Sequence, residues 1–173
     1  MFISNKTHES LKQMEDILGT ELVTQGGGTQ PLAEATAGVK FTGLYFGAHW
    51  APCCRRFTTT LTEKYNEINT AASKEFEVVF VSKDGNQAAF DRNFAEMPWK
   101  AIKYDDEARK KSLEQKYGIM EIPMLIILGA NGQQVSDNGI RDLQNHVSAA
   151  IIEVWEKMAE ASEAEAGQAV AAQ

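Results

Sequence analysis

Two spacings of hydrophobic residues recur along the chain, one typical of helices and the other of buried strands. Leu11, Met14, Ile17 and Leu18 follow the helical period of about 3.6 residues, which predicts an amphipathic helix over 7–18. The segment FTGLYFGA is instead mostly apolar and aromatic, as in a central strand that is covered on both faces. The same criteria predict strands at 21–24, 41–48, 76–82, 100–104, 124–128 and 133–136, and further helices at 53–69, 84–97, 105–117 and 143–158.

Turn and cap residues separate these elements. Asn131-Gly132 lies between two apolar segments and predicts a β-hairpin. Asp84 is expected to cap the helix that follows it, and Pro52 suits the first turn of a helix, where the missing N–H has no helical partner. Strands that alternate with helices, followed by a hairpin and a closing helix, predict one α/β domain. Its sheet is expected to be mixed, with a parallel part and an antiparallel edge.

The chain has 173 residues, a length that fits one domain with a tail better than two domains. After residue 158 the sequence is rich in Ala and Glu, and Val170 is its only large apolar residue, so we expect solvated helix or disorder there. We therefore divide the chain into an N-terminal helix at 1–19, a folded domain at 20–158 and a tail at 159–173.

Charge and hydropathy narrow the classes of partner and the expected compartment. The formal net charge of −7 argues against nucleic acid, because phosphate binding requires clustered Lys and Arg. No stretch approaches the roughly 20 apolar residues of a membrane span, so no membrane partner is expected. The opening MFISNKTHES lacks the features of a signal or transit peptide, which makes a cytoplasmic location the expectation.

The chain has only two cysteines, Cys53 and Cys54, and they are adjacent. Neighbouring cysteines cannot cross-link distant segments, so no disulfide framework exists. Consecutive Cα atoms lie about 3.8 Å apart, whereas disulfides usually span about 4.4–6.8 Å. A cis peptide that closes the ring would cost about 2.5–4 kcal/mol. We therefore expect no disulfide between the two residues.

Three segments resemble the tryparedoxins and nucleoredoxins. LYFGAHWAPCCRRF (44–57) is similar to the segment in which Trp-Cys-Pro-Pro-Cys-Arg opens the active-site helix of that family. EMPWKAIKYDDE (96–107) is similar to its Met-Pro-Trp segment, and YGIMEIPMLIIL (117–128) to the segment with its cis-proline loop. The resemblance covers roughly 20–145 and implies a thioredoxin-like three-layer sandwich, with the predicted hairpin at the C-terminal edge of its sheet.

The chain departs from that family at the attacking cysteine. If Trp50 is aligned with the family tryptophan, Ala51 falls on the attacking cysteine and Pro52 on the first proline. Cys53 then falls on the second proline and Cys54 on the resolving cysteine. In the family reaction, the first thiolate attacks a disulfide and the second cysteine releases the mixed disulfide. Ala51 has no sulfur, so we do not expect this two-cysteine cycle to operate.

Several roles remain open for the residues around this site. Cys53 or Cys54 could act as a single thiol, which would make the protein an atypical thiol-disulfide oxidoreductase, or both could fill space in the core. Whether the protein is an enzyme is therefore left open. His49 could join the thiols on zinc or copper, but a structural zinc site would lack one ligand, so no metal or cofactor is expected. Arg55 and Arg56 could bind an anion or lie on a solvated helix face.

The resemblance also implies a binding site for another protein. Pro123, if cis, would leave the backbone of Ile122 free to bond an extended segment of a partner chain, the strand-addition mode of recognition. Such binding needs no nucleophile. We therefore expect a non-catalytic binding or structural module whose partner contacts a groove formed by Trp50, Ala51, Pro52, Ile122 and Pro123.

Overall fold

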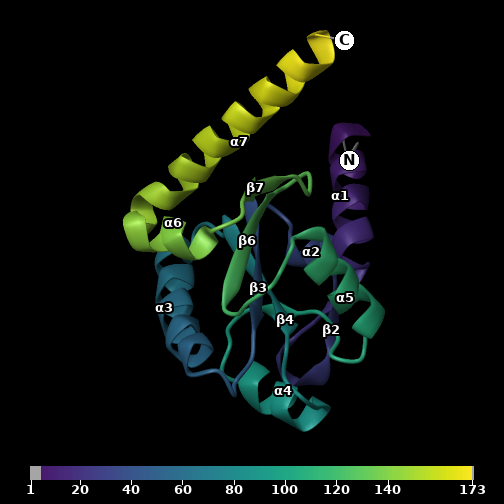
Figure 1. Ribbon diagram of the computed structural model, residues 1–173, viewed down its shortest axis with the longest axis vertical. Coiled ribbons are helices and arrows are strands. Elements are labelled where there is room, and N and C mark those ends of the chain that lie inside the picture. Colours follow the sequence, from purple (N-terminus) through teal and green to yellow (C-terminus); the bar gives the residue numbers. More distant parts are fainter. Residues whose placement is uncertain (1–4, 173) are drawn as a thin grey trace.

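A seven-stranded sheet forms the middle layer of the computed structural model, which describes residues 5–172 (Figure 1). In the order β2-β1-β5-β4-β3-β6-β7, only the β3–β4 and β4–β5 pairs are parallel. The expected mixed sheet, with its parallel part and its C-terminal hairpin, is thereby confirmed. The strands are β1 (Glu21–Val23), β2 (Thr29–Pro31), β3 (Phe41–Gly47), β4 (Phe76–Ser82), β5 (Lys100–Ala101), β6 (Met124–Gly129) and β7 (Gln134–Ser136).

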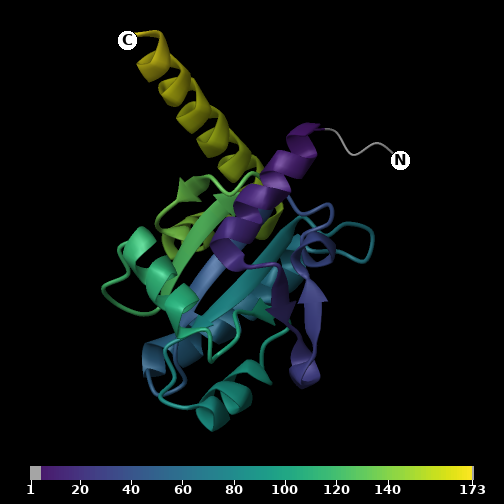
Figure 2. The same cartoon turned by 90° about the vertical axis from the view of Figure 1, so that its right-hand side faces the viewer.

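Helices cover both faces of this sheet (Figures 1 and 2). One face carries α1 (Asn5–Leu18), α2 (Leu32–Ala35) and α5 (Glu107–Lys116). The other carries α3 (Pro52–Ile68), α4 (Gln87–Phe94), α6 (Gly139–Asn145) and α7 (Ser148–Ala171), and a short 3-10 turn, η1 (Gln25–Gly27), joins β1 to β2. The three layers are those of a thioredoxin-like sandwich, so the predicted fold class is correct.

The continuous apolar sequence of β3 follows from its place between two cores. Phe41 and Tyr45 point into the core beneath α3 and α7, whereas Leu44 and Phe46 point into the core beneath α1 and α5. Successive side chains of a strand point to opposite faces, so a strand covered on both faces needs mostly apolar residues on both. All seven residues of β3 are buried.

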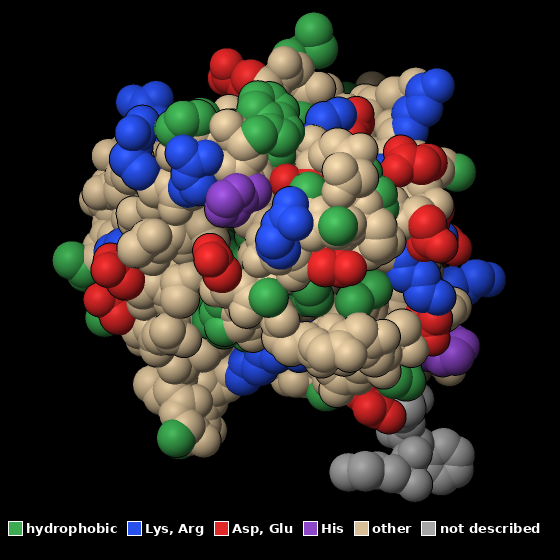
Figure 3. All heavy atoms as spheres, turned by 90° about the horizontal axis from the view of Figure 1, so that it is seen from below, with side chains coloured by type: hydrophobic (Ala, Val, Ile, Leu, Met, Phe, Trp, Pro, Cys, Tyr) green, Lys and Arg blue, Asp and Glu red, His purple; other side chains and the backbone are tan. Residues whose placement is uncertain are grey.

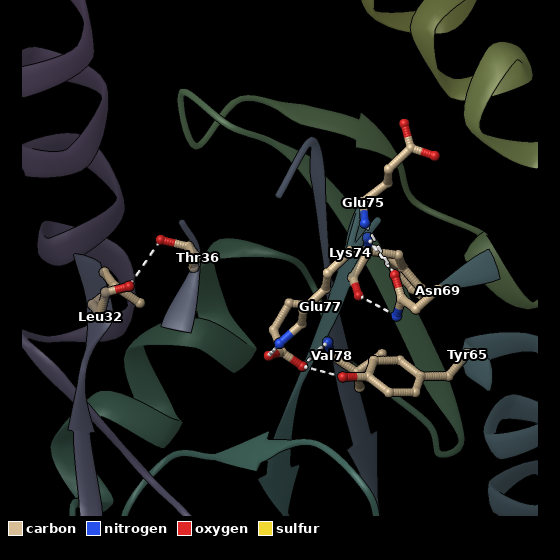
Figure 4. Close-up of polar contacts among 9 residues, drawn as sticks. Leu32, Thr36, Tyr65, Asn69, Lys74, Glu75, Glu77 and Val78 are labelled. Atoms are coloured by element: carbon tan, nitrogen blue, oxygen red, sulfur yellow. Dashed lines mark hydrogen bonds and ion pairs between the residues drawn. The ribbon is translucent and has the colours of Figure 1, made fainter. Parts of the chain in front are cut away.

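A buried carboxylate lies at the start of β4 (Figure 4). Glu77 is fully buried, and its oxygens accept hydrogen bonds from the Tyr65 hydroxyl at 3.2 Å and from the Val78 N–H at 2.9 Å. The ammonium of Lys74 pairs with the same carboxylate. A buried charge is tolerated only where donors and a counter-ion replace water, and these three groups do so. Through Tyr65 the network ties α3 to β4.

The end of α3 is fastened to the same strand by Asn69 (Figure 4). The Asn69 side-chain oxygen accepts from the backbone N–H groups of Glu75 and Phe76, both at 3.0 Å. The side-chain nitrogen donates to the Phe76 carbonyl at 2.7 Å. One amide therefore serves three backbone groups that would otherwise lack partners. This anchor at the far end of α3 helps to fix the direction in which its first turn points.

The structure corrects three local predictions. Asp84 does not cap the helix after it, because Asn86 accepts from the Ala89 N–H at 2.9 Å in that role. The strand predicted at 100–104 ends at Ala101. The single helix predicted at 143–158 is two helices, because the backbone is extended at His146 and Val147. Strand β2 and helix α2 were not predicted.

Helix α7 continues without a break from Ser148 to Ala171, and every described residue from Glu160 onward is exposed. Figure 1 shows this part of the helix standing away from the sheet. Solvated helix, one of the two states expected for the tail, is therefore the one observed. The division into an N-terminal helix, a domain and a tail stays a prediction. None of the helices in residues 5–172 combines the length and the apolar content needed to cross a membrane.

Candidate functional site

The site is built on the turn between β3 and α3. Ala51 is the N-cap of α3, and its carbonyl accepts from the backbone N–H groups of Cys54 at 3.0 Å and Arg55 at 3.2 Å. Pro52 occupies the first helical position, as predicted. The Ala51 side chain is only 4% exposed. The position that the family alignment gives to an attacking sulfur thus holds a buried methyl group.

The two adjacent thiols lie in different environments. Cys53 is exposed, whereas Cys54 is 2% exposed and points into the core. Burial raises the pKa of the Cys54 thiol, because the charged thiolate loses its solvation. The Tyr45 hydroxyl donates to the Cys54 carbonyl at 3.1 Å and holds this turn of the helix against β3. Both cysteines are free thiols, and of the two only Cys53 is exposed at the surface.

The loop before β6 meets Cys53. The Ile122-Pro123 peptide bond is cis, as the resemblance implied. The Sγ atom of Cys53 lies 3.7 Å from the Ile122 carbonyl oxygen, a contact between residues 69 positions apart in the sequence. No backbone–backbone hydrogen bond engages Ile122 within the described part of the chain. The predicted partner-binding residues from the two segments are therefore brought together, with part of the Ile122 backbone still available.

Large apolar side chains are exposed at the same end of the molecule. Trp50 is 65% exposed, yet its indole N–H donates to the Lys83 carbonyl at 3.2 Å. Met120, in the loop before Pro123, is 94% exposed. Figure 3 views this end and shows apolar side chains next to Lys and Arg side chains and a histidine. We call the set formed by Trp50, Pro52, Cys53, Ile122 and Pro123 the Trp50 surface.

Asp84 holds the turn that carries Trp50. One oxygen of this buried carboxylate accepts from the His49 backbone N–H at 2.9 Å. The other accepts from the Ser82 hydroxyl at 2.8 Å and from the Asn93 amide at 3.0 Å. Sequence analysis gave Asp84 a capping role and missed this one. The position of Asp84 just after a buried strand was the available signal, since neighbouring parallel strands end at the same edge of a sheet.

Two arginines border the site on α3. Arg55 and Arg56 are both exposed, and no carboxylate of the described residues lies within 4.0 Å of either guanidinium. Arg55 donates to the His49 carbonyl and lines an open pocket of about 370 Å³ beside the Trp50 surface. The remaining lining residues are polar or acidic, namely His49, Thr58, Thr59, Thr62, Glu63, Asn93 and Glu96.

His49 does not join the cysteines in a ligand cluster. Its backbone bonds Asp84 and Arg55, and its side chain is exposed on the pocket side. Among residues 5–172 no group of three or more His, Cys, Asp or Glu side chains is placed to hold a metal ion. The chemistry that the arrangement offers is therefore that of one exposed thiol beside an apolar surface with two free cations.

Comparison with known proteins supports the thioredoxin-like fold and the resemblance to nucleoredoxins and tryparedoxins. A family described as thioredoxin-like matches residues 38–134. Nucleoredoxin from Mus musculus is 38% identical over 134 residues, which cover 78% of this chain but 30% of that protein. The chain thus spans less than a third of the length of this curated relative.

Solved structures of tryparedoxins share both the fold and part of the sequence. Tryparedoxin I from Leishmania major is 32% identical, with a TM-score of 0.66 over 74% of this chain and 86% of that one. Tryparedoxin from Trypanosoma brucei is 30% identical, with a TM-score of 0.67 over 76% of this chain and 91% of that one. The thioredoxin-like family match at residues 38–134 includes all the residues of the Trp50 surface.

Proposed function

Since the chain belongs to the tryparedoxin- and nucleoredoxin-like members of the thioredoxin fold, we propose that it is a binding module that has lost two-cysteine catalysis. Its Trp50 surface binds an extended segment of another protein. Family membership indicates that the Trp50 surface corresponds to a redox site in related proteins. The residues of this chain determine which steps of that redox chemistry it can still perform.

The observation that carries the proposal is the state of the first turn of α3. Ala51 is buried and has no sulfur, and Cys54, three residues later, is buried, which raises the pKa of its thiol. A disulfide exchange cycle requires a thiolate that attacks and a second thiol that releases the product. With an alkyl group in the first place, the second thiol has no mixed disulfide to resolve.

The binding capacity does not depend on that sulfur. Trp50 stays exposed because its N–H is bonded to Lys83 and its turn is held by Asp84. An exposed, fixed aromatic ring contributes contact area to a complex with little loss of side-chain entropy. The free backbone of Ile122 supports hydrogen bonding to an extended partner, as in strand addition.

The experiment is a selection of extended peptides from a displayed library on the full chain, followed by affinity measurements on variants. We expect Trp50→Ala to weaken the selected peptides by about 2 kcal/mol or more, the size of an aromatic hot spot. Val147→Ala, which truncates another exposed apolar side chain remote from the site, is the matched control and should leave affinity unchanged. Peptides that bind equally to Trp50→Ala would exclude the surface as their site.

One observation favours a second function. Cys53 is exposed and its sulfur lies at the Ile122 carbonyl, where a bound segment would pass. A single thiol there could attack a disulfide, form a mixed disulfide through Cys53 and expel the other half as a thiolate; an external thiol would then release it. Cys53→Ser separates the two functions. It should abolish any such exchange while peptide affinity persists, and loss of affinity in this variant would favour the monothiol function.

A further inference from the structure

The two arginines at the start of α3 have no acidic partner among the described residues. Seven other Lys and Arg side chains form ion pairs within 4.0 Å, namely Lys40, Lys74, Lys83, Lys103, Arg109, Lys110 and Lys157. Arg55 uses one N–H on the His49 carbonyl, and Arg56 has no side-chain hydrogen bond to any described residue. Two arginines adjacent in the sequence thus keep most of their guanidinium donors free in a chain whose formal net charge is −7.

These cations lie beside the exposed thiol. Arg56 follows Cys53 by three residues, so the two side chains share one side of α3. The Asp84 carboxylate, in the loop just after β4, is buried and already accepts from three donors. Glu63 and Glu96 line the pocket next to Arg55 but stay beyond ion-pair distance from it. The α3 edge of the Trp50 surface is therefore a positively charged region on a protein whose net charge is negative.

The loop on the opposite edge has the opposite charge. Glu121 precedes Ile122 directly, is exposed and has no ion pair with a described residue. Lys83, whose backbone carbonyl accepts from the Trp50 indole, pairs through its ammonium with Glu114 at 2.8 Å. A segment that crosses the surface between α3 and this loop thus passes Arg55 and Arg56 on one edge and Glu121 on the other.

We propose that the segment bound at the Trp50 surface is acidic, with carboxylates on the edge that faces Arg55 and Arg56. This deepens the proposed function and rests on it. A carboxylate accepts two parallel N–H bonds from one guanidinium, and such charge-assisted pairs are stronger than neutral hydrogen bonds. Complementary charge also speeds encounter and rejects segments of the wrong sign.

The test measures how charge near Cys53 affects capture of a peptide. Three extended peptides of equal length carry one central cysteine activated as a 2-thiopyridyl disulfide and differ only in flanking Glu, Gln or Lys residues. The Cys53 thiolate attacks the peptide sulfur, a Cys53–peptide disulfide forms, and the leaving sulfur takes a proton as pyridine-2-thione, which absorbance records. Cys53→Ser should abolish the reaction, and 2,2′-dithiodipyridine serves as an uncharged small reference.

We expect the Glu peptide to react roughly tenfold faster than the Lys peptide at low salt, the lower end of electrostatic steering. Net charge alone predicts the reverse order, since the whole chain is acidic. The difference in rate between the Glu and the Lys peptide should disappear near 1 M salt, where the screening length falls to about 3 Å. This rate difference should also disappear in the double variant Arg55→Ala/Arg56→Ala. It should persist in Arg141→Ala, which removes an exposed arginine on α6 that has no ion pair with a described residue.

The outcomes distinguish failure of the acidic preference from failure of the proposed binding function. Equal rates for the three peptides, or a rate difference unchanged in the double arginine variant, would overturn the acidic preference. Trp50→Ala should slow all three peptides relative to 2,2′-dithiodipyridine, because only a peptide is long enough to contact the indole. If that slowing occurs without a charge effect, the binding surface stands and only the acidic preference is wrong. If Trp50→Ala changes no ratio, the proposed function itself fails.

Discussion

Returning a sulfur to position 51 should rebuild a redox pair with Cys54. Residues three apart on an α-helix, with a rise of 1.5 Å per residue and a Cα radius of about 2.3 Å, have Cα atoms about 5 Å apart. That separation lies within the range of about 4.4–6.8 Å that disulfides span, unlike the roughly 3.8 Å between consecutive residues. In Ala51→Cys the new thiol would sit at the N-cap of α3, three positions before Cys54.

The expected gain is large because the second step becomes intramolecular. Oriented groups within one molecule reach effective molarities of about 10⁵–10⁸ M, so even a small fraction of that should raise insulin-reduction turnover at least about a hundredfold. The variant also carries a penalty. Ala51 is 4% exposed, and enlarging a side chain in a packed site costs about 1–3 kcal/mol, which thermal unfolding will report.

Two double variants identify which two cysteines form the disulfide in Ala51→Cys. Ala51→Cys/Cys54→Ser should lose both the disulfide, seen by intact mass, and the turnover, because no resolving thiol remains. Ala51→Cys/Cys53→Ala should keep both, since Cys53 faces outward and takes no part. If the single variant forms no disulfide, or if removal of Cys54 leaves turnover intact, then position 51 is not the site of the missing sulfur and the reasoning is wrong.

Three further predictions follow from burial. Iodoacetamide should modify Cys53 at least about a hundredfold faster than Cys54, because exposing Cys54 requires local opening that costs about 3 kcal/mol or more; peptide mass mapping will show equal rates if this is wrong. Tyr117 has a buried hydroxyl without a partner among the described residues, and burial raises its pKa to about 12, so Tyr117→Phe should be neutral or stabilising at pH 7. Above pH 10 the unfolded tyrosine ionises first, so wild-type stability should fall relative to Tyr117→Phe as the pH rises toward 12, measured by urea denaturation. Truncation after Ala161 should change the free energy of unfolding by less than about 0.5 kcal/mol, since all described residues beyond it are exposed; a larger loss would show that the end of α7 packs on the body.

Strong local signals made most of the fold predictable. The apolar sequence of β3 implied a strand covered on both faces, and Asn131-Gly132 implied the β6–β7 hairpin, which the pairing of Leu128 with Gln134 confirms. Gly118 closes α5 with a φ of +61°, a conformation that glycine adopts without strain. In each case a few neighbouring residues determine the outcome.

Predictions failed where distant residues decide the local structure. The break between α6 and α7 has neither glycine nor proline, and Asp142 in the first turn of α6 accepts from the Trp155 indole at 3.1 Å, a contact no local pattern reveals. Asp84 could be recognised as a support for the Trp50 turn only once β3 and β4 were known to be parallel neighbours. The contact between Cys53 and Ile122 likewise depends on tertiary structure, and only the family resemblance anticipated it.

The exposure of Trp50 gives the protein an optical property of its own. The two other tryptophans, Trp99 and Trp155, are fully buried, so iodide in solution can collide with one indole alone. Collisional quenching of the native fluorescence therefore reports on a single place, without any attached dye. A ligand that covers the ring protects this component of the emission, whereas one that docks elsewhere leaves the quenching constant unchanged.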